Sequence, residues 1–290
     1  MTKQIKQIED LEIWDDFMFG VVMQKKELCR PLLEMILQVR IKDIRYLELQ
    51  KTIKKRYDAK GIRLDVFVDD GEGTVYNIEI QTTDQKNLPK RARYYRGMID
   101  LNILEKGKDY NQLKKSYVIF ICNYDPFSRG RCIYRFENLC TDDPSLKLGD
   151  DTAIIIVNPY GTNDGKMGRG FAAFLEYLRS GKATDSYTEA LAEEVDSVRA
   201  SEEWRREYML LLERDRENQN IGEQRGIKIG QKIGQEIGQK IGQKIGEQNG
   251  AKKDAAELFK NGASYDLVRR SISKEKISDE ELQEIYDSAR

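Results

Sequence analysis

The sequence contains no histidine among its 290 residues. Histidine is the usual general base of enzymes, the commonest protein metal ligand and the side chain that titrates near neutral pH. Its absence excludes Ser-His-Asp hydrolysis, Cys-His proteolysis, histidine-ligated zinc and HNH-type nuclease chemistry. An enzyme built from this chain must therefore use carboxylates, lysines, tyrosines or a carboxylate-bound metal ion.

Cysteines and long apolar runs are also scarce. The four cysteines contain no CxxC pair, and without histidine they predict no zinc site, so we expect reduced and mostly structural thiols at Cys29, Cys122, Cys132 and Cys140. The first residues, MTKQIKQIED, lack the apolar core of a signal peptide. No window approaches the ~20 apolar residues that a membrane span needs. These features predict a cytoplasmic protein without a membrane partner.

The charges are numerous but balanced. The chain carries 49 basic and 50 acidic residues, so its net charge is -1 and no global field would attract nucleic acid or an acidic membrane. Any such binding must come from local patches. With 39% hydrophobic and 34% charged residues, the composition indicates one real core together with an elongated, charged part.

The first part of the chain predicts an α/β fold. Helical spacing of apolar residues occurs over 10–38, 88–107 and 171–181, and Asp15 or Asp16 is the expected N-cap of the first helical region. Runs rich in β-branched and aromatic residues predict strands at 44–49, 62–70, 75–82, 116–123, 132–138 and 152–158. Strands followed by a crossover helix and another apolar strand indicate a mixed sheet flanked by helices.

The composition changes near residue 184, and four regions follow from it. We assign residues 1–183 to the α/β domain, 184–218 to a helical extension, 219–250 to a glycine repeat and 251–290 to a small C-terminal helical segment. In the repeat, glycine recurs at every fourth position from Gly222 to Gly250. Each glycine costs a helix ~1 kcal/mol, so we expect an isolated helix there to fray.

Two interpretations of the glycine repeat remain open. Glycines beside isoleucines permit close approach of two helices, which would make a homo-oligomer through residues 184–250. The alternative is a flexible polar spacer, since the four-residue period drifts by ~40° per repeat around a helix.

The most informative segment is the predicted hairpin at residues 61–81. Two alternating strands flank DDGEG, which is a turn signal. A turn centred on Glu72 places Asp65 opposite Glu79 and Arg63 opposite Gln81. One face is then apolar, and the other carries Arg63, Asp65, Asn77, Glu79 and Gln81.

Two carboxylates that face each other across a hairpin require an explanation, because like charges in this position are destabilising. A hard divalent cation such as Mg²⁺ supplies one, since it binds one or two carboxylates together with water and phosphate oxygens. The alternative is an exposed hairpin face on which Asp65 and Glu79 lie together by chance and Arg63 neutralises them.

These motifs resemble the PD-(D/E)XK nuclease superfamily, and within it the Rpn-type recombination-promoting nuclease/transposase family. The resemblance covers about residues 10–180, through WDDFMFGVVM, RLDVFVDD, the triplet Glu79-Ile80-Gln81, KRARYY and SYVIFIC. It implies a restriction-endonuclease-like fold and a Mg²⁺-dependent DNA endonuclease, with Mn²⁺ as a substitute. The implied setting is bacterial recombination or mobile-element biology.

The same resemblance implies the roles of the site residues. Asp65 and Glu79 would be the metal ligands, and Gln81 stands at the position of the superfamily's catalytic lysine. A neutral glutamine can only orient groups by hydrogen bonds, but this triplet also looks usual for the family, so it does not indicate a dead site. The missing positive charge could come from Lys86, Lys90 or Arg91, and the accessory candidates are Asp16, Arg63 and Lys86.

Two basic clusters flank the hairpin and predict DNA as the partner. Their side chains would contact phosphates without reading sequence, with Tyr57, Tyr94 and Tyr95 available for stacking. The expected DNA-binding residues are Lys54, Lys55, Arg56, Lys90, Arg91, Arg93 and Tyr94. The alternative function is a non-catalytic nucleic-acid-binding or oligomeric interaction protein on the same fold.

Overall fold

The computed structural model describes residues 6–53, 62–163 and 165–289. It divides the chain into two compact units, of which the first ends at Leu210 and the second begins at Leu211. The two units are described separately below.

The first unit is built on one six-stranded sheet with the strand order β1-β2-β3-β4-β6-β5. Antiparallel pairs at both ends enclose the parallel strands β3, β4 and β6, so the predicted mixed sheet is confirmed. The strands are β1 (Tyr46–Ile53), β2 (Ile62–Asp69), β3 (Thr74–Gln81), β4 (Lys115–Cys122), β5 (Ile133–Phe136) and β6 (Thr152–Val157).

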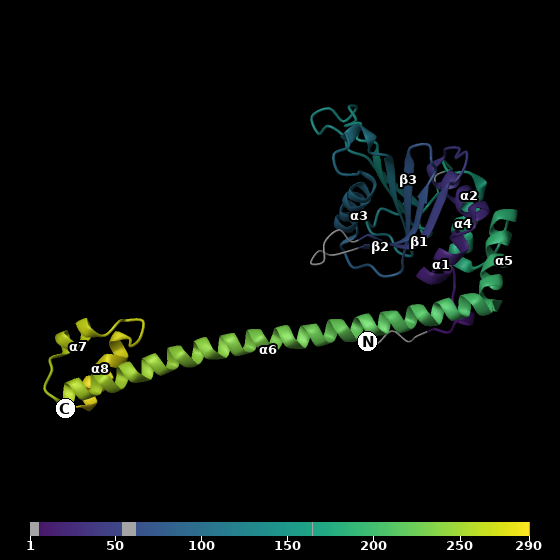
Figure 1. Ribbon diagram of the computed structural model, residues 1–290. Helices are drawn as coiled ribbons and strands as arrows, with labels where there is room; N and C mark the ends of the chain where they lie inside the picture. Colours follow the sequence, from purple (N-terminus) through teal and green to yellow (C-terminus); the bar gives the residue numbers. More distant parts are fainter. Residues whose placement is uncertain (1–5, 54–61, 164, 290) are drawn as a thin grey trace. The chain divides into compact units, whose positions relative to one another are not determined.

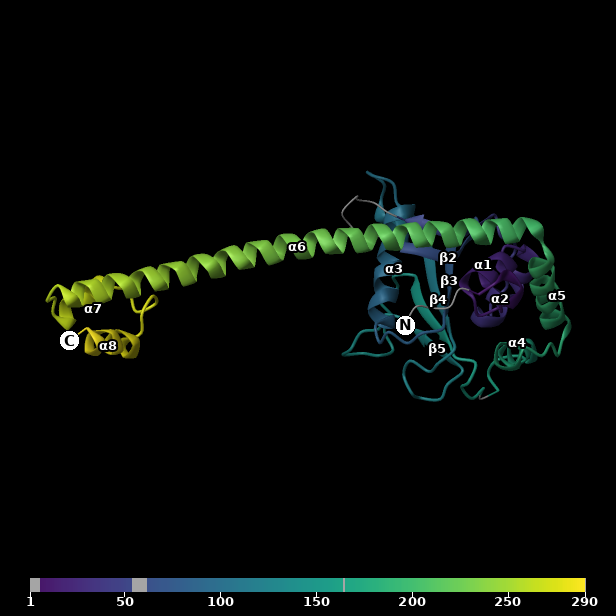
Figure 2. The same ribbon diagram turned by 90° about the horizontal axis from the view of Figure 1, so that it is seen from below.

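Helices cover both faces of this sheet. Figures 1 and 2 show α3 on one face and α1, α2 and α4 on the other. The helices are α1 (Asp16–Met23), α2 (Lys26–Leu37), α3 (Leu88–Ile103), α4 (Arg169–Ser180) and α5 (Ser186–Ala200), with short 3-10 turns η1 (Ile8–Asp10) and η2 (Tyr110–Gln112). The arrangement is the α/β restriction-endonuclease-like fold that the sequence predicts.

The N-terminal helical region is divided in two. The structure ends α1 at Met23 and begins α2 at Lys26, where the sequence predicted continuous helical spacing. Asp15 takes the N-cap position of α1, but its carboxylate binds the Lys6 ammonium at 2.8 Å and the Glu12 N–H at 2.8 Å instead of a helix N–H. The predicted cap position is therefore correct, and the capping hydrogen bond is absent.

Helix α3 follows its apolar period closely. Pro89 lies in the first turn, where its missing N–H costs nothing. Leu88, Ala92 and Ile99 are buried, and they pack in one cluster with Phe120 of β4. This packing fixes the helix against β4, and Arg91 on its flank then reaches Gln81 at the end of β3.

Helix α5 packs with the first unit as well. It contacts α1, α2 and α4, and Leu191, Val195 and Val198 on its inner face are buried. A capping box between Asp185 and Thr188 fixes its start. The helical extension therefore adds to the core at least as far as this helix.

The glycine repeat is helical in the structure. Helix α6 runs from Glu202 to Lys260 through all the repeat glycines, so the expected fraying is not observed. A glycine weakens a helix through backbone entropy but keeps its N–H and C=O, so the hydrogen-bond pattern continues through it.

Within the described residues no helix is long and apolar enough to cross a membrane.

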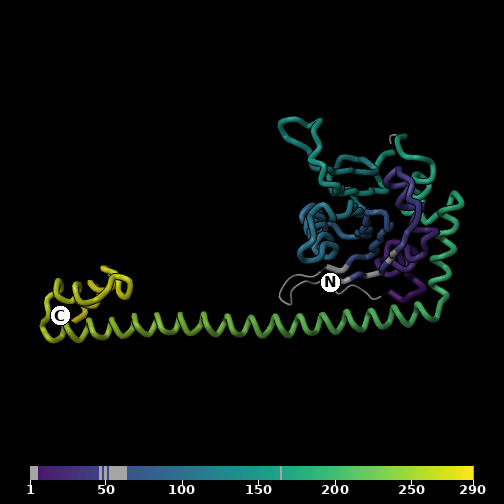
Figure 3. The backbone as a smooth tube through the Cα atoms, turned by 45° about the horizontal axis from the view of Figure 1, so that its top comes forward, coloured from purple at the N-terminus to yellow at the C-terminus, as the bar shows by residue number. Residues whose placement is uncertain are grey.

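The end of the chain forms a small helical cluster. Gly262, with φ of 88°, follows the end of α6, and α7 (Tyr265–Ser271) and α8 (Asp279–Ser288) come next. Ser278 and Glu281 cap α8 reciprocally. Figure 3 draws these helices in yellow beside the end of α6, where Phe259 packs with buried residues of both.

Candidate active site

The predicted hairpin of β2 and β3 is present in the predicted register. Val66 pairs with Ile78, and the ladder continues to Asp69 opposite Val75. The Asp70 carboxylate organises the turn by accepting the N–H groups of Glu72 at 2.8 Å and Thr74 at 2.9 Å. The DDGEG turn therefore sets the alignment that brings the two proposed metal ligands together.

At the end away from the turn, side chains replace main-chain pairing. The N–H of Asp65 donates to Oε1 of Glu79 at 3.1 Å, and the N–H of Ile80 donates to Oδ2 of Asp65 at 3.0 Å. Each carboxylate therefore takes the place of a backbone carbonyl between β2 and β3. The two acids are held by the hairpin itself and do not depend on flexible loops for their position.

Glu79 is a buried carboxylate. Its side chain is 1% exposed and also accepts the Asn77 amide N–H at 3.1 Å. Burial, followed by the charge of Asp65, raises the pKa of Glu79 well above its ordinary value, although the N–H of Asp65, the charge of Arg91 and Asn77 act in the opposite direction. The alternative of an exposed hairpin face is wrong for Glu79.

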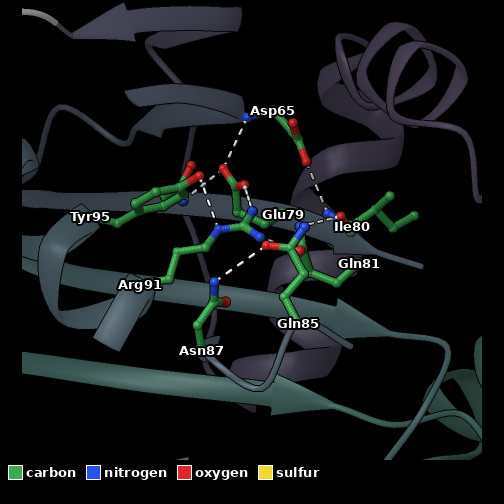
Figure 4. A network of polar contacts seen from close by, with 9 residues as sticks. Asp65, Glu79, Ile80, Gln81, Gln85, Asn87, Arg91 and Tyr95 are labelled. Carbon is green, nitrogen blue, oxygen red and sulfur yellow. Dashed lines mark hydrogen bonds and ion pairs between the residues drawn. The ribbon is translucent and has the colours of Figure 1, made fainter. Parts of the chain in front are cut away.

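Arg91 is the cation of this site. Its guanidinium lies 3.3 Å from Oε2 of Glu79, donates to Oε1 of Gln81 at 2.5 Å and donates through Nε to the Tyr95 hydroxyl at 3.2 Å. Figure 4 shows this group between the three side chains. Burial, followed by the charge of Glu79, raises the pKa of Tyr95 to about 12, so the tyrosine stays neutral beside the arginine.

The other predicted catalytic and accessory residues lie at different distances from this network. Gln81 ends β3, and its amide nitrogen donates to the Ile80 carbonyl at 2.5 Å. Lys86 pairs with Asp84 at 2.5 Å in the connection before α3. Asp16 is the first residue of α1, and Arg63 lies in β2, where its backbone alone is described. Of the three candidate cations, the structure therefore brings Arg91 to the carboxylates.

The predicted DNA-binding residues fall into two groups. Lys54, Lys55, Arg56 and the neighbouring Tyr57 lie outside the described residues. On α3, Lys90 and Arg93 are exposed, and Tyr94 is 40% exposed. Tyr95, offered by the sequence for stacking, is instead buried under α3 against Phe120.

Asn77 is a site residue that the sequence analysis left without a role. It stands one strand period before Glu79, so its amide reaches the Glu79 carboxylate on the same face. Its own Oδ1 is buried and has no hydrogen-bond partner among the described residues. A water held in the site would satisfy this atom, which fits a hydrated metal centre.

The donor atoms available here suit a hard cation. Within the described residues no cluster of three or more acidic or cysteine side chains could hold a metal ion. The site offers the carboxylates of Asp65 and Glu79, whose oxygens already accept main-chain N–H groups between β2 and β3. Mg²⁺ is commonly bound by one or two carboxylates while it keeps several waters, so this donor set fits it.

Comparison with known proteins gives a match to a nuclease family. Residues 16–159 match the family model described as PD-(D/E)XK nuclease family transposase. The matched segment contains the whole hairpin, α3 and the sheet through β6. No curated protein and no solved structure matches the chain.

Proposed function

The chain belongs to the PD-(D/E)XK nuclease family of transposases, and on that premise we propose that it is a metal-dependent DNA endonuclease. The observation that carries the proposal is the position of Asp65 and Glu79, whose carboxylates both accept main-chain N–H groups between β2 and β3, with the Arg91 guanidinium beside Glu79. A purely structural hairpin has no need for a buried glutamate next to a second acid. Membership of this family supports a role in recombination or mobile-element biology.

Asp65 and Glu79 would hold the ion, with Mg²⁺ as the proposed cofactor and Mn²⁺ as a substitute. When bound, the metal supplies a hydroxide from coordinated water and stabilises charge on the phosphate. The hairpin keeps both carboxylates oriented through the N–H groups of Asp65 and Ile80. Such preorganisation favours the transition state because the ligands need no rearrangement during the reaction.

Gln81 and Arg91 would divide the work of the superfamily lysine. The Gln81 amide is not a base that could take a proton from water. It would instead orient a water or a phosphate by hydrogen bonds. Arg91 holds the Gln81 carbonyl oxygen at 2.5 Å and supplies a permanent positive charge. A guanidinium would stabilise phosphate charge, but it is not a general base and would not take the proton of the attacking water.

The outer side of α3 would bind the DNA backbone. Lys90, Arg93 and Tyr94 are exposed on the helix that also carries Arg91, so they lie near the proposed site. Contacts of this kind position a duplex without specifying its sequence. The basic segment 54–56, which lies outside the described residues, stays a predicted part of the same surface.

Plasmid nicking by the purified full-length chain tests the proposal. We expect cleavage with Mg²⁺ or Mn²⁺ and none with EDTA. If the chain binds DNA but leaves it intact with either metal, the alternative of a non-catalytic nucleic-acid-binding protein is correct.

The proposed roles of Gln81 and Arg91 predict what happens when the positive charge is moved from position 91 to position 81. The sequence alone predicts that Gln81→Lys retains or raises activity, because it restores the superfamily cation. The 2.5 Å contact with Arg91 changes this expectation, since a lysine would meet a guanidinium. We expect Gln81→Lys to lower the cleavage rate about tenfold, and Gln81→Lys combined with Arg91→Gln to recover most of it.

Single-turnover rates for both single variants and the double variant measure this coupling. Strictly additive losses in the double variant would contradict the assignment of one shared cationic role. Lys86→Gln is the matched control, because Lys86 already pairs with Asp84 outside the network.

We also propose self-association through the repeat of α6. The isoleucines of its tetrads are about half exposed, from 59% for Ile229 to 50% for Ile245. A Cβ added at any repeat glycine, for example Gly234 or Gly238, would meet nothing within 4 Å. The described chain therefore has no steric need for these glycines, whereas a second helix in close approach would have one.

Replacing Gly230, Gly234, Gly238 and Gly242 by alanine separates this proposal from the spacer alternative. Alanine raises helix propensity by ~1 kcal/mol per site, so helicity should rise in either case. If the glycines form an interface, light scattering will report a smaller species for the variant than for the wild type. An unchanged oligomeric state would favour the spacer.

A further inference from the structure

The proposed site lies at the carboxyl ends of the parallel strands β3, β4 and β6. We call this side of the sheet its carboxyl edge. Gln81 pairs with Cys122 in the parallel register, and Ile121 pairs with Val157. The N–H of Asn123 donates to the carbonyl of Gln81 at 3.0 Å. The connection that leaves β4 therefore starts in direct contact with the site.

Two connections at this edge, residues 123–131 and 158–163, are bound to each other, and we call them the edge loops. The N–H of Thr162 donates to the carbonyl of Gly130 at 2.7 Å, and the Asn158 amide donates to the carbonyl of Arg131 at 3.2 Å. At Gly161 an added Cβ would come within 2.2 Å of the Arg131 carbonyl group. Only glycine allows this approach, so the two loops form one braced structure.

The charge that the edge loops present is positive. The Asp125 carboxylate is turned inward, where it accepts the Tyr134 hydroxyl at 2.8 Å and the N–H groups of Phe127 at 3.0 Å and Gly130 at 2.7 Å. Arg129 and Arg131 are exposed. Neither guanidinium takes part in an ion pair with the residues that the structure describes.

We propose that Arg129 and Arg131 of the edge loops form a second phosphate-contacting surface for DNA beside the active site. The inference rests on the proposed nuclease function, because that function requires a polyanion at this edge. Arg131 lies just before β5, which is three strand positions from β3 in the sheet, so at ~4.8 Å per position it lies roughly 14 Å from the end of β3. With ~3.4 Å of helix axis per nucleotide, these contacts fall about four nucleotides from the scissile phosphate.

The fixed backbone of the edge loops makes this surface suitable for positioning. Arginine binds phosphate through a planar fork of donors, and its geometry is retained when the main chain does not move. The exposed Tyr160, 58% accessible in the adjoining loop, adds a hydroxyl donor of the kind that commonly contacts DNA backbone. Together with α3, the edge loops would hold the duplex at two places around the cleavage point.

The test compares Arg129→Gln/Arg131→Gln with Lys106→Gln/Lys108→Gln in the full-length chain. The control removes two exposed charges from the connection between α3 and β4, at the opposite edge of the sheet. Binding to a short duplex is measured by fluorescence anisotropy in EDTA over a range of salt concentrations, and cleavage is measured with Mg²⁺. Arg129→Lys/Arg131→Lys keeps the charges and serves as the conservative variant.

We expect the arginine-to-glutamine variant to bind DNA about tenfold more weakly and to lose about 1.8 from the salt slope, the value for two phosphate contacts. Its KM should rise while kcat stays unchanged. The lysine control should match the wild type, and the conservative variant should keep the salt slope. Unchanged affinity and slope in a variant with wild-type circular dichroism would overturn the inference, whereas a wild type that neither binds nor cuts DNA would overturn the proposed function itself.

Discussion

Glu79→Gln is expected to lower Mg²⁺-dependent DNA cleavage at least about a thousandfold, because it removes one of two carboxylate ligands. The change keeps the size of the side chain, and an amide oxygen can still accept the N–H of Asp65. The loss should therefore come from the metal site and not from unfolding. Asp65→Asn should give a similar loss.

The same variant should change how stability depends on pH. The folded-state pKa of Glu79 lies well above its ordinary value of 4.5, so in the metal-free protein the native state holds this proton more tightly than the unfolded state. Stability then falls as pH rises from about 4.5 toward the folded pKa. The melting temperature of Glu79→Gln, compared with wild type in EDTA, should therefore improve progressively from pH 5 to pH 8.

Glu72→Gln provides the matched control for both measurements. It makes the same chemical change in the turn of the same hairpin, where Glu72 is 51% exposed and pairs with Lys42. Cleavage and the pH dependence of melting should both stay at wild-type values. Wild-type cleavage by Glu79→Gln would remove Glu79 from the metal site, and a flat pH difference would contradict its raised pKa.

The register of the hairpin could be predicted from the sequence, but the burial of its acidic residues could not. Strict alternation on both strands and the DDGEG turn leave little freedom in register, since a slip by one residue would move every apolar side chain to the other face. The positions of Asp65 and Glu79 relative to each other followed from this alone. What the alternation could not give is the burial of Glu79, because that depends on a helix from elsewhere in the chain.

The helical period of α3 does predict which of its two tyrosines, Tyr94 or Tyr95, is buried. Leu88, Ala92 and Tyr95 share one face of the predicted helix, and the structure buries all three. The same period places Tyr94 outward, where it is 40% exposed. Helical spacing by itself therefore argues for Tyr94 and against Tyr95 as a residue that stacks on bases.

The choice among Lys86, Lys90 and Arg91 needed the tertiary structure. All three positions are close to the Glu79 triplet in sequence, but the approach of α3 to the end of β3 decides which side chain reaches the carboxylate. The packing of Ala92 against the sheet places the neighbouring Arg91 over Gln81 and Glu79. Local propensity carries no information on this approach.

At a pH where Glu79 is ionised, Arg91→Met is expected to destabilise the metal-free protein by about 3 kcal/mol, because it leaves the buried carboxylate without its cation. Methionine keeps the apolar stem that packs beside Tyr95 and Phe120, so the effect isolates the charge. Urea unfolding in EDTA measures the free energy directly. Lys90→Met, at the exposed position directly before Arg91 in the same helix, should change the free energy of unfolding by less than about 0.5 kcal/mol.

A double-mutant cycle identifies the partner of Arg91. If the cost arises from an unpaired Glu79 charge, Arg91→Met should cost much less in the Glu79→Gln background. Added Mg²⁺ should also reduce the cost in the wild-type background, since a bound cation compensates the same carboxylates. An equal loss in both backgrounds would mean that Arg91 stabilises the fold through Gln81 or Tyr95 and not through the charge of Glu79. That outcome would also weaken the assignment of Arg91 as the cation that replaces the superfamily lysine, because such a cation must act on the same charged centre as the metal.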